Sequence, residues 1–475
     1  MKKFINVLAV LMALVMCLGV VVACANGDEE DAATEGTTTA ASTTKPQAQT
    51  TTKPTQTTTT VEETTTDRYA NRTKEPTVEV PADGVITTAE QLHAVLVKGA
   101  VDGNYTVNAA TLDMSKYAWA GMTGFTGTFD FNGCVITGAI DSLFLTVLGG
   151  TVKNLTIADT EYLYTNDDAT AEVDPKDNTS PNLHYSPVIR YATDVTVENV
   201  VIDKTVKVKS DIWTNNSCHG GIVGGAYGTS ILVSNCHFHG HYESDSLVLR
   251  MGGVAGIINS SSASSVNMDV PEDSTVKVVN CTNTGFVNNI SVGGDSKVAA
   301  VVGYLGNGAV IKCANYGEMD SLGAGQTAGV VGYVGGSTHI KDCVNTGKVK
   351  GANFTGGICG YSNGSARYFT NCINLGNVTS DTDNWGGVIG LIKSSETITN
   401  CFNLNTEAAT TEFAHGLYNN VTAPVNPADP ATHGSAVITN CANLDTVDAI
   451  FTAMDTVNAG VFEKTNGIIK VVIAQ

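Results

Sequence analysis

The sequence feature that most limits the possible folds is a phrase of about thirty residues that occurs three times between residues 328 and 405. Each copy has a glycine-flanked apolar run, a polar turn and the pattern hydrophobic-x-Asn/Asp-Cys-x-Asn. The cysteines Cys343, Cys372 and Cys401 are 29 residues apart, and Cys313 precedes the first by 30. A unit this short cannot bury its own apolar face and must stack on its neighbours. The repeat therefore predicts an all-β fold, a right-handed parallel β-helix solenoid.

Composition supports an extended β protein and excludes one class of partner. The 475 residues include 49 glycines and 11 prolines, and only 15% are charged, which is typical of glycine-punctuated β structure rather than helices. The formal net charge is −20, with 26 basic residues and no basic run. Because nucleic-acid binding requires clustered Lys and Arg, we expect no nucleic-acid partner.

Cysteine and asparagine recur at fixed positions of the repeat. Neighbouring coils stack about 4.8 Å apart, so these residues predict an inward column of free thiols and an asparagine ladder with amide hydrogen bonds from coil to coil. Some disulfides, or a metal site, remain alternatives. The cysteines are Cys236, Cys281, Cys313, Cys343, Cys372, Cys401 and Cys441, and the asparagines Asn283, Asn315, Asn345, Asn374, Asn403 and Asn443.

The N-terminus predicts export and anchoring. Residues 1–23 have a basic start and an apolar run, as in a secretory signal peptide. The following Val21-Val22-Ala23-Cys24 resembles a bacterial lipobox, which implies a lipidated, palmitate-type anchor on Cys24 at the extracytoplasmic face of the cell membrane. Residues 24–78 form a Thr-rich segment that we expect to be a disordered linker. A tether of about 50 residues spans roughly 40 Å root-mean-square.

The folded part is predicted to begin at residue 79 and to carry caps at both ends. A helix over residues 87–96 has a threonine N-cap candidate and closes the first coil. The repeat domain then runs over 79–445, interrupted by irregular segments at 160–186, 258–275 and 406–435. Residues 446–475 are predicted to form a C-terminal cap, with a helix over 446–457 and a strand over 467–473.

Two groups of phrases resemble a known family. The sequences FDFNGCVITG and GGTVKNLTI resemble entry coils of bacterial surface β-helix proteins, and residues 220–405 resemble GLUG-type repeats, with GGIVG followed by phrases of the form TNCxNxGxV. The resemblance covers about residues 85–445. It implies a parallel β-helix of the pectate-lyase-like kind in a surface lipoprotein with an adhesin-like role, without a shared active site.

One histidine-rich stretch is a candidate metal site. If residues 236–243 form one strand, His237, His239, His241 and Glu243 share its outer face, because Cys236 points inward. Imidazoles spaced this way hold Zn²⁺ only if the strand is distorted or a neighbouring coil helps, where His219 is a candidate. The alternative is a polar strand that faces solvent. A second cation hypothesis, Ca²⁺, concerns the acidic residues Asp167, Asp168, Asp174 and Asp177.

An aromatic row is the candidate ligand-binding site. Tyr304, Tyr333 and Tyr361 follow the repeated glycine in consecutive copies, with Leu391 in the next. Such residues stack from coil to coil, and an exposed row gives sugar rings a platform. A buried row is corner packing instead.

These features favour a binding role. We expect a lipid-anchored, adhesin-like cell-surface protein that binds a glycan or a surface protein. A spacer without a specific ligand is an alternative. Polysaccharide cleavage, by a lyase or glycosidase, is a second alternative, but the sequence shows no recognisable carboxylate pair, nucleophile motif or phosphate loop.

Overall fold

The computed structural model describes residues 69–472, except 166–182, 213–216, 247–248, 292–294, 324, 364–365, 383, 394–395 and 405–436. The predicted signal peptide, Cys24 and most of the predicted linker lie outside the described residues, as do the four aspartates of the acidic segment. One compact unit begins at Arg72, before the predicted start at residue 79. The Arg72 guanidinium donates hydrogen bonds of 3.1, 2.9 and 3.0 Å to the carbonyls of Met114, Tyr117 and Gly138.

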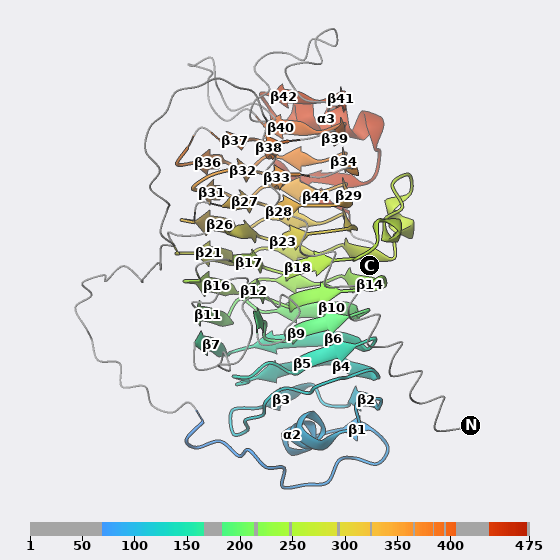
Figure 1. The fold of residues 1–475 in the computed structure, drawn as a ribbon, viewed down its shortest axis with the longest axis vertical. Helices are drawn as coiled ribbons and strands as arrows, with labels where there is room; N and C mark the ends of the chain where they lie inside the picture. The colour runs from blue at the N-terminus through green and yellow to red at the C-terminus, as the bar shows by residue number, and fades with distance from the viewer. Residues whose placement is uncertain are drawn as a thin grey trace, which may run out of the picture. The chain divides into compact units, whose positions relative to one another are not determined.

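The compact unit is the predicted parallel β-helix (Figure 1). Its largest sheet, here the long sheet, contains two strands from most coils, and all its pairings between neighbours are parallel. Its described strands are β1 (Val85–Ile86), β2 (Asn104–Val107), β3 (Thr111–Asp113), β4 (Thr128–Thr137), β6 (Thr151–Ala158), β10 (Thr196–Ile202), β14 (Ile231–Ser234), β15 (His237–Phe238), β19 (Val276–Val279), β20 (Thr282–Asn283), β24 (Gly308–Ile311), β25 (Ala314–Asn315), β29 (Ser337–Lys341), β30 (Val344–Asn345), β34 (Ala366–Thr370), β35 (Ile373–Asn374), β39 (Glu396–Thr399), β40 (Phe402–Leu404), β41 (Val437–Thr439) and β42 (Ala442–Leu444).

Three further parallel sheets supply the remaining strands, and most coils pass through them in chain order. The second sheet contains β7 (Glu161–Thr165), β11 (Lys207–Asp211), β16 (His241–Ser244), β21 (Phe286–Asn289), β26 (Glu318–Ser321), β31 (Val349–Gly351) and β36 (Val378–Ser380). The third contains β8 (His184–Tyr185), β12 (Ser217–Gly220), β17 (Leu249–Gly252), β22 (Lys297–Ala299), β27 (Gln326–Ala328), β32 (Thr355–Gly356) and β37 (Trp385–Gly386). The fourth contains β5 (Phe144–Leu148), β9 (Ile189–Thr193), β13 (Val223–Tyr227), β18 (Ala255–Asn259), β23 (Val302–Leu305), β28 (Val331–Val334), β33 (Cys359–Ser362) and β38 (Ile389–Ile392).

The interior is filled by apolar columns that run from coil to coil. One continuous cluster of buried side chains extends from Ile86 to Cys401. The ten described cysteines are free, and all but Cys441 are buried, so the predicted thiol column is observed without disulfides. Burial raises the pKa of the Cys281 and Cys343 thiols well above its ordinary value, so these thiols stay protonated and act as small apolar side chains.

The predicted asparagine ladder is also present. The side-chain amide of each asparagine donates to the side-chain oxygen of the next, from Asn283 to Asn443, over 2.7–2.9 Å. Four of these amides also donate to the backbone carbonyl two residues later, over 3.0–3.2 Å. These bonds satisfy amides that the interior would otherwise leave without partners.

A second polar column marks the bend inside the long sheet, and sequence analysis did not identify it. The residue before each repeated cysteine has a positive φ, for example 56° at Asn371 and 54° at Asn400. Asn and Asp tolerate this left-handed conformation better than most residues. Their side chains form an outer ladder, in which Asn371 donates to Asp342 and Asn400 donates to Asn371, each over 2.9 Å. Lys312, with φ of 53°, interrupts the column.

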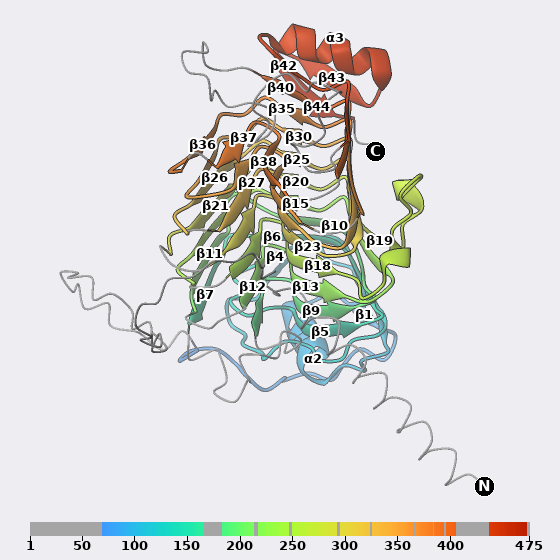
Figure 2. The same cartoon turned by 45° about the horizontal axis from the view of Figure 1, so that its top comes forward.

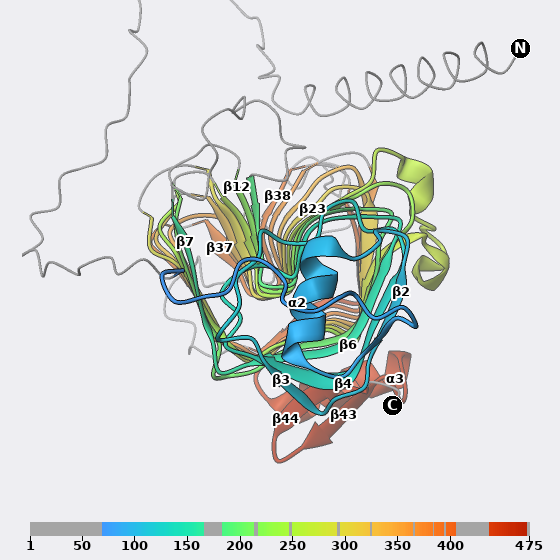
Figure 3. The same ribbon diagram turned by 90° about the horizontal axis from the view of Figure 1, so that it is seen from below.

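The predicted N-terminal capping helix is α2 (Ala89–Lys98). Thr88 is its N-cap and accepts a hydrogen bond from the backbone of Gln91 over 3.3 Å, as in a capping box. Its buried face includes Leu92, Val95 and Leu96. Seen along the solenoid, α2 lies across the opening of the first coils (Figure 3).

The C-terminal segment differs from a simple end cap. It contains α3 (Val447–Val457) and an antiparallel hairpin of β43 (Phe462–Thr465) and β44 (Ile468–Val471), of which β43 was not predicted. α3 and the hairpin lie against the outside of the long sheet (Figures 2 and 3). They form a separate apolar cluster with four side chains that each follow a repeated cysteine: Ala314, Val344, Ile373 and Phe402.

The amino acids in one outer column of the long sheet explain why the C-terminal segment lies there. In the earlier coils the residue after the cysteine is polar, His237 and Thr282, whereas from Ala314 onward it is apolar. A column of apolar side chains on an outer face needs a cover, and Ile450 and Ile469, both 0% exposed, supply it. The prediction of a terminal cap was therefore incomplete, because the segment shields the side of several coils.

Candidate ligand-binding site

The aromatic row lies on the outer face of the fourth sheet. Tyr304, Tyr333 and Tyr361 are partners in register on β23, β28 and β33, and Leu391 continues the column on β38. All three tyrosines are half-buried, so each ring keeps an accessible part. The row is therefore neither fully exposed nor merely internal corner packing.

The tyrosine rings contact one another from coil to coil. The ring centroids of Tyr304 and Tyr333 are 5.2 Å apart at an interplanar angle of 14°, a stacked arrangement. Those of Tyr333 and Tyr361 are 5.3 Å apart at 72°, an edge-on arrangement, and Phe354 stacks on Tyr361 at 5.3 Å and 20°. These spacings are close to the rise of one coil, about 4.8 Å, so the backbone repeat sets the spacing of the platform.

The third sheet supplies basic side chains to the same place, which sequence analysis missed. Arg250 on β17 and Lys297 on β22 are partners in register. The Arg250 guanidinium lies 5.5 Å from the ring centroid of Tyr304, and the Lys297 ammonium lies 5.6 Å from that of Tyr333. Both distances fit cation–π contacts. An alignment of the repeats could have shown that the two cations occupy one equivalent position, because each lies two residues before a Gly-Gly or Ala-Ala pair.

Glycine lets the two sheets meet closely enough for these contacts. Between the third and fourth sheets the chain turns inward, as Figure 3 shows between β12 and β23. At Gly332 an added Cβ would lie 2.8 Å from the backbone nitrogen of Val298. Any larger residue there would push the sheets apart, so the repeated glycine positions the tyrosine that follows it. We name this place the re-entrant corner: Arg250, Lys297 and the three tyrosines.

A carboxylate at the edge of the re-entrant corner is already engaged. Asp295 accepts hydrogen bonds from Lys297 over 2.7 Å and from the Gln326 side chain over 2.8 Å. Burial raises the pKa of Asp295, but the nearby Lys297 charge and these hydrogen bonds outweigh it and lower the pKa below its ordinary value. Asp295 is therefore ionised at neutral pH and neutralises Lys297.

A second aromatic group lies near the start of the same two sheets. Tyr191 and Tyr227 stack at 5.3 Å and 25°, and His184 approaches both rings edge-on. The Nε2 atom of His184 is 3.0 Å from the Tyr227 hydroxyl. Gly225 leaves room for the imidazole, because an added Cβ would lie 2.4 Å from it. Aromatic side chains thus line this junction both before and after the coil that carries Ile257.

The predicted histidine strand does not exist as one strand. β15 ends at Phe238 and β16 begins at His241, because Gly240 lies at a corner between the long and second sheets. His237 and His239 stack at 6.2 Å on one side of the corner, while His241 and Glu243 lie on the other, with 4.0 Å between their Nε2 and Oε2 atoms. The prediction of a shared face was therefore wrong.

The surroundings of these residues fit hydrogen bonding better than metal binding. The Nδ1 atoms of His237 and His239 lie 2.8 and 2.5 Å from the Thr282 and Thr284 hydroxyls. Burial lowers the pKa of both imidazoles, so they are neutral at pH 7. Within the described residues, no three His, Cys, Asp or Glu side chains lie close enough together to hold a metal ion.

His219, the predicted helper from a neighbouring coil, points into the solenoid. It is 0% exposed and lies 5.1 Å from the ring of Tyr185, and its Nδ1 is 3.1 Å from the Tyr242 hydroxyl. Burial lowers its pKa to about 3, so it is a neutral interior side chain and cannot reach the outer histidines.

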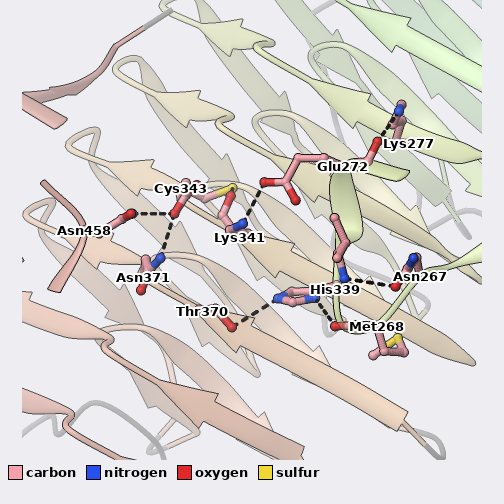
Figure 4. Close-up of polar contacts among 12 residues, drawn as sticks. Asn267, Met268, Glu272, Lys277, His339, Lys341, Cys343, Thr370, Asn371 and Asn458 are labelled. Atoms are coloured by element: carbon pink, nitrogen blue, oxygen red, sulfur yellow. Dashed lines mark hydrogen bonds and ion pairs between the residues drawn. The ribbon is translucent and has the colours of Figure 1, made fainter. Parts of the chain in front are cut away.

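The irregular segment at 258–275 does not line the re-entrant corner. It carries two short 3₁₀ turns, Ala263–Ser265 and Pro271–Asp273, and folds over the outside of β24 and β29 in the long sheet (Figures 1 and 4). Glu272 pairs with Lys341 at 2.6 Å, and the Met268 carbonyl lies 3.1 Å from Nδ1 of His339. The segment therefore covers another face and leaves the tyrosines to the two sheets.

No protein-family model and no curated protein matches the sequence. In the described part of the chain, no helix has both the length and the apolar character needed to cross a membrane.

Proposed function

We propose that this protein is a lipid-anchored, adhesin-like binder at the cell surface, and that the aromatic row of Tyr304, Tyr333 and Tyr361 binds carbohydrate. The observation that carries the proposal is the regular, half-buried stack of three rings on one sheet face. Sugar rings have apolar faces that pack on aromatic rings. Because the stacked coils already hold the three rings in place, the protein loses little conformational entropy when a chain of sugars binds.

The sequence of the N-terminus supports the location. A signal-like segment at 1–23, the lipobox-like Cys24 and the Thr-rich segment at 24–78 are the parts that a surface-displayed protein needs. A flexible tether of about 50 residues would hold the β-helix roughly 40 Å from its anchor. Displaying a rigid platform at that distance suits contact with glycans outside the cell.

A glycan array probed with the full chain, purified in detergent, tests the proposal. The array is run with and without Ca²⁺ and Zn²⁺. We expect selective signal on one class of sugar, because the spacing of the rings fits only some chains. Incubation of a bound oligosaccharide with the protein, followed by product analysis, distinguishes binding from cleavage.

Matched tyrosine variants locate the site. Tyr333→Ala removes the central ring and should weaken binding about fivefold or more, if a sugar ring gains from stacking the about 1–3 kcal/mol that a nucleic-acid base gains on an aromatic side chain. Tyr333→Phe keeps the ring and should retain most of the affinity. Tyr368→Ala is the control, because Tyr368 is a half-buried tyrosine on β34 of the long sheet, near His339. A blank array, or equal losses in Tyr333→Ala and Tyr368→Ala, would contradict the proposal.

A spacer role is the second candidate, and the two asparagine ladders favour it. Continuous ladders such as Asn283 to Asn443 stiffen a solenoid along its length. If the array is blank, chains shortened by two coils should still reduce the distance between the C-terminal segment and the membrane of the parent cell, and this distance is the measurement for a spacer.

A further inference from the structure

Arg250 is the cation in the re-entrant corner that lacks a carboxylate. Its guanidinium contacts the Tyr304 ring, and its other polar neighbours are the Cys218 thiol and Tyr227. Burial raises the pKa of Cys218, so this thiol is uncharged. Arg250 also lowers the pKa of Asp295 through its charge, as a minor contribution beside Lys297. Among the described residues, no carboxylate lies within ion-pair distance of it, and its buried Nε has no hydrogen-bond partner. A guanidinium stays charged in a protein, and a partly buried charge without an anion at ion-pair distance is costly.

Lys297, one coil later at the same register position, shows the contrast. Its side chain is 14% exposed, and its ammonium pairs with Asp295 at 2.7 Å. The corner therefore holds two cations, Arg250 and Lys297, and one carboxylate, Asp295, which leaves one net positive charge. This local positive charge lies beside an aromatic platform. The formal net charge of the whole chain is −20, so the protein as a whole repels anions, and any binding of an anion at the corner must come from the local charge.

We propose that the saccharide bound by the aromatic row carries an anionic group, a carboxylate or a sulfate, and that Arg250 receives it. This inference rests on the proposed function, since the tyrosines hold the sugar ring and Arg250 selects its substituent. The planar fork of a guanidinium matches both oxyanions with two parallel hydrogen bonds. The Tyr304 ring holds that fork in place, so the anion meets a cation that is already oriented.

Binding to three matched oligosaccharides of four glucose-type units tests the inference. The first carries hydroxymethyl groups, the second carboxylates and the third 6-O-sulfates at the same carbon. The full chain is titrated with each one, and with the variants Arg250→Gln, Arg250→Lys and Lys348→Gln. Lys348 is an exposed residue before β31 in the second sheet, so Lys348→Gln removes the same charge elsewhere. The two acidic probes separate carboxylate from sulfate recognition.

We expect the protein to bind at least one acidic probe more tightly than the neutral probe, by about tenfold or more, a difference of about 1.4 kcal/mol. Arg250→Gln should bring that ratio close to one, Arg250→Lys should restore part of it, and Lys348→Gln should leave it unchanged. The preference should also shrink when salt rises from 50 to 500 mM. The salt titration uses the unaltered protein, so its result can be interpreted even if the Arg250 variants fold poorly.

The outcomes separate the two proposals. Equal affinity for neutral and acidic probes, with Tyr333→Ala weakening both, overturns the role of Arg250 and keeps the aromatic platform. A preference for acidic probes that Arg250→Gln and Lys348→Gln reduce equally also overturns it, because general electrostatics then suffices. No binding of these probes or of any array sugar removes the proposed function, and this inference with it.

Discussion

Replacing one interior asparagine of the ladder should destabilise the solenoid far more than replacing an end member. Asn345 is 0% exposed. Its amide donates to the Asn374 side chain over 2.7 Å and to the Gly347 carbonyl over 3.0 Å, and its side-chain oxygen accepts from Asn315 over 2.8 Å. Asn345→Ala removes all three bonds and leaves the buried oxygen of Asn374 without that donor.

The magnitude follows from these contacts. Each lost bond costs about 1 kcal/mol, and an unsatisfied buried acceptor adds about 1–3 kcal/mol. We therefore expect Asn345→Ala to lower the free energy of unfolding by about 4–6 kcal/mol. Asn443 ends the ladder, is exposed and accepts one bond, from Asn403 over 2.9 Å. Asn443→Ala should cost no more than about 1 kcal/mol.

Urea unfolding followed by circular dichroism measures both variants against the parent chain. Similar slopes with different midpoints would mean that stability alone has changed. Native-state hydrogen exchange adds a local measure, and protection should fall first in β25, β30 and β35, the coils next to Asn345. If Asn345→Ala and Asn443→Ala cost the same within about 1 kcal/mol, the ladder contributes little and the reasoning is refuted.

Three further predictions concern other columns. Lys312→Asn should raise the unfolding free energy by about 1–2 kcal/mol, because Asn tolerates the φ of 53° and its amide reaches the buried, unpartnered oxygen of Asn280; no gain in a thermal melt would contradict this. His219 has a pKa of about 3 in the folded state and an ordinary value near 6.5, so the unfolded chain binds its proton first. Its contribution is fully present above about pH 6.5 and is lost as pH falls toward 3, up to about 5 kcal/mol; His219→Gln should flatten that slope, and an unchanged slope would show that other groups cause it. Ile450→Asp should detach the C-terminal segment from the long sheet, which increases binding of an apolar dye while strand circular dichroism persists; loss of all strand signal would mean that the segment is part of the main core.

The sequence predicted the features that repeat. The period of 29 residues, the cysteine column, the asparagine ladder and the tyrosine register follow from one fact, that equivalent positions of a solenoid stack on one another. The helix at the N-terminal end was predicted because a threonine N-cap candidate precedes apolar residues at helical spacing. Period and capping are local properties, so they can be read along the chain.

Features that depend on the cross-section of a coil were not predicted. The contact between Arg250 and Tyr304 joins residues 54 positions apart (304 − 250), and it needs the third and fourth sheets to meet. The corner at Gly240 separated His237 from His241, because a strand pattern of alternating residues does not show where the chain bends. The side position of α3 depended on a change of character from Thr282 to Ala314 in one outer column.

The most direct test of the carbohydrate site is hydroxyl-radical footprinting of the full chain with and without a saturating oligosaccharide from the array. Tyr304, Tyr333 and Tyr361 should lose most of their oxidation when the sugar is bound, because it covers the accessible part of each ring. Tyr368, on β34, should keep its oxidation level. Bound sugar with unchanged oxidation of the aromatic row, or equal protection of Tyr368, would contradict the account.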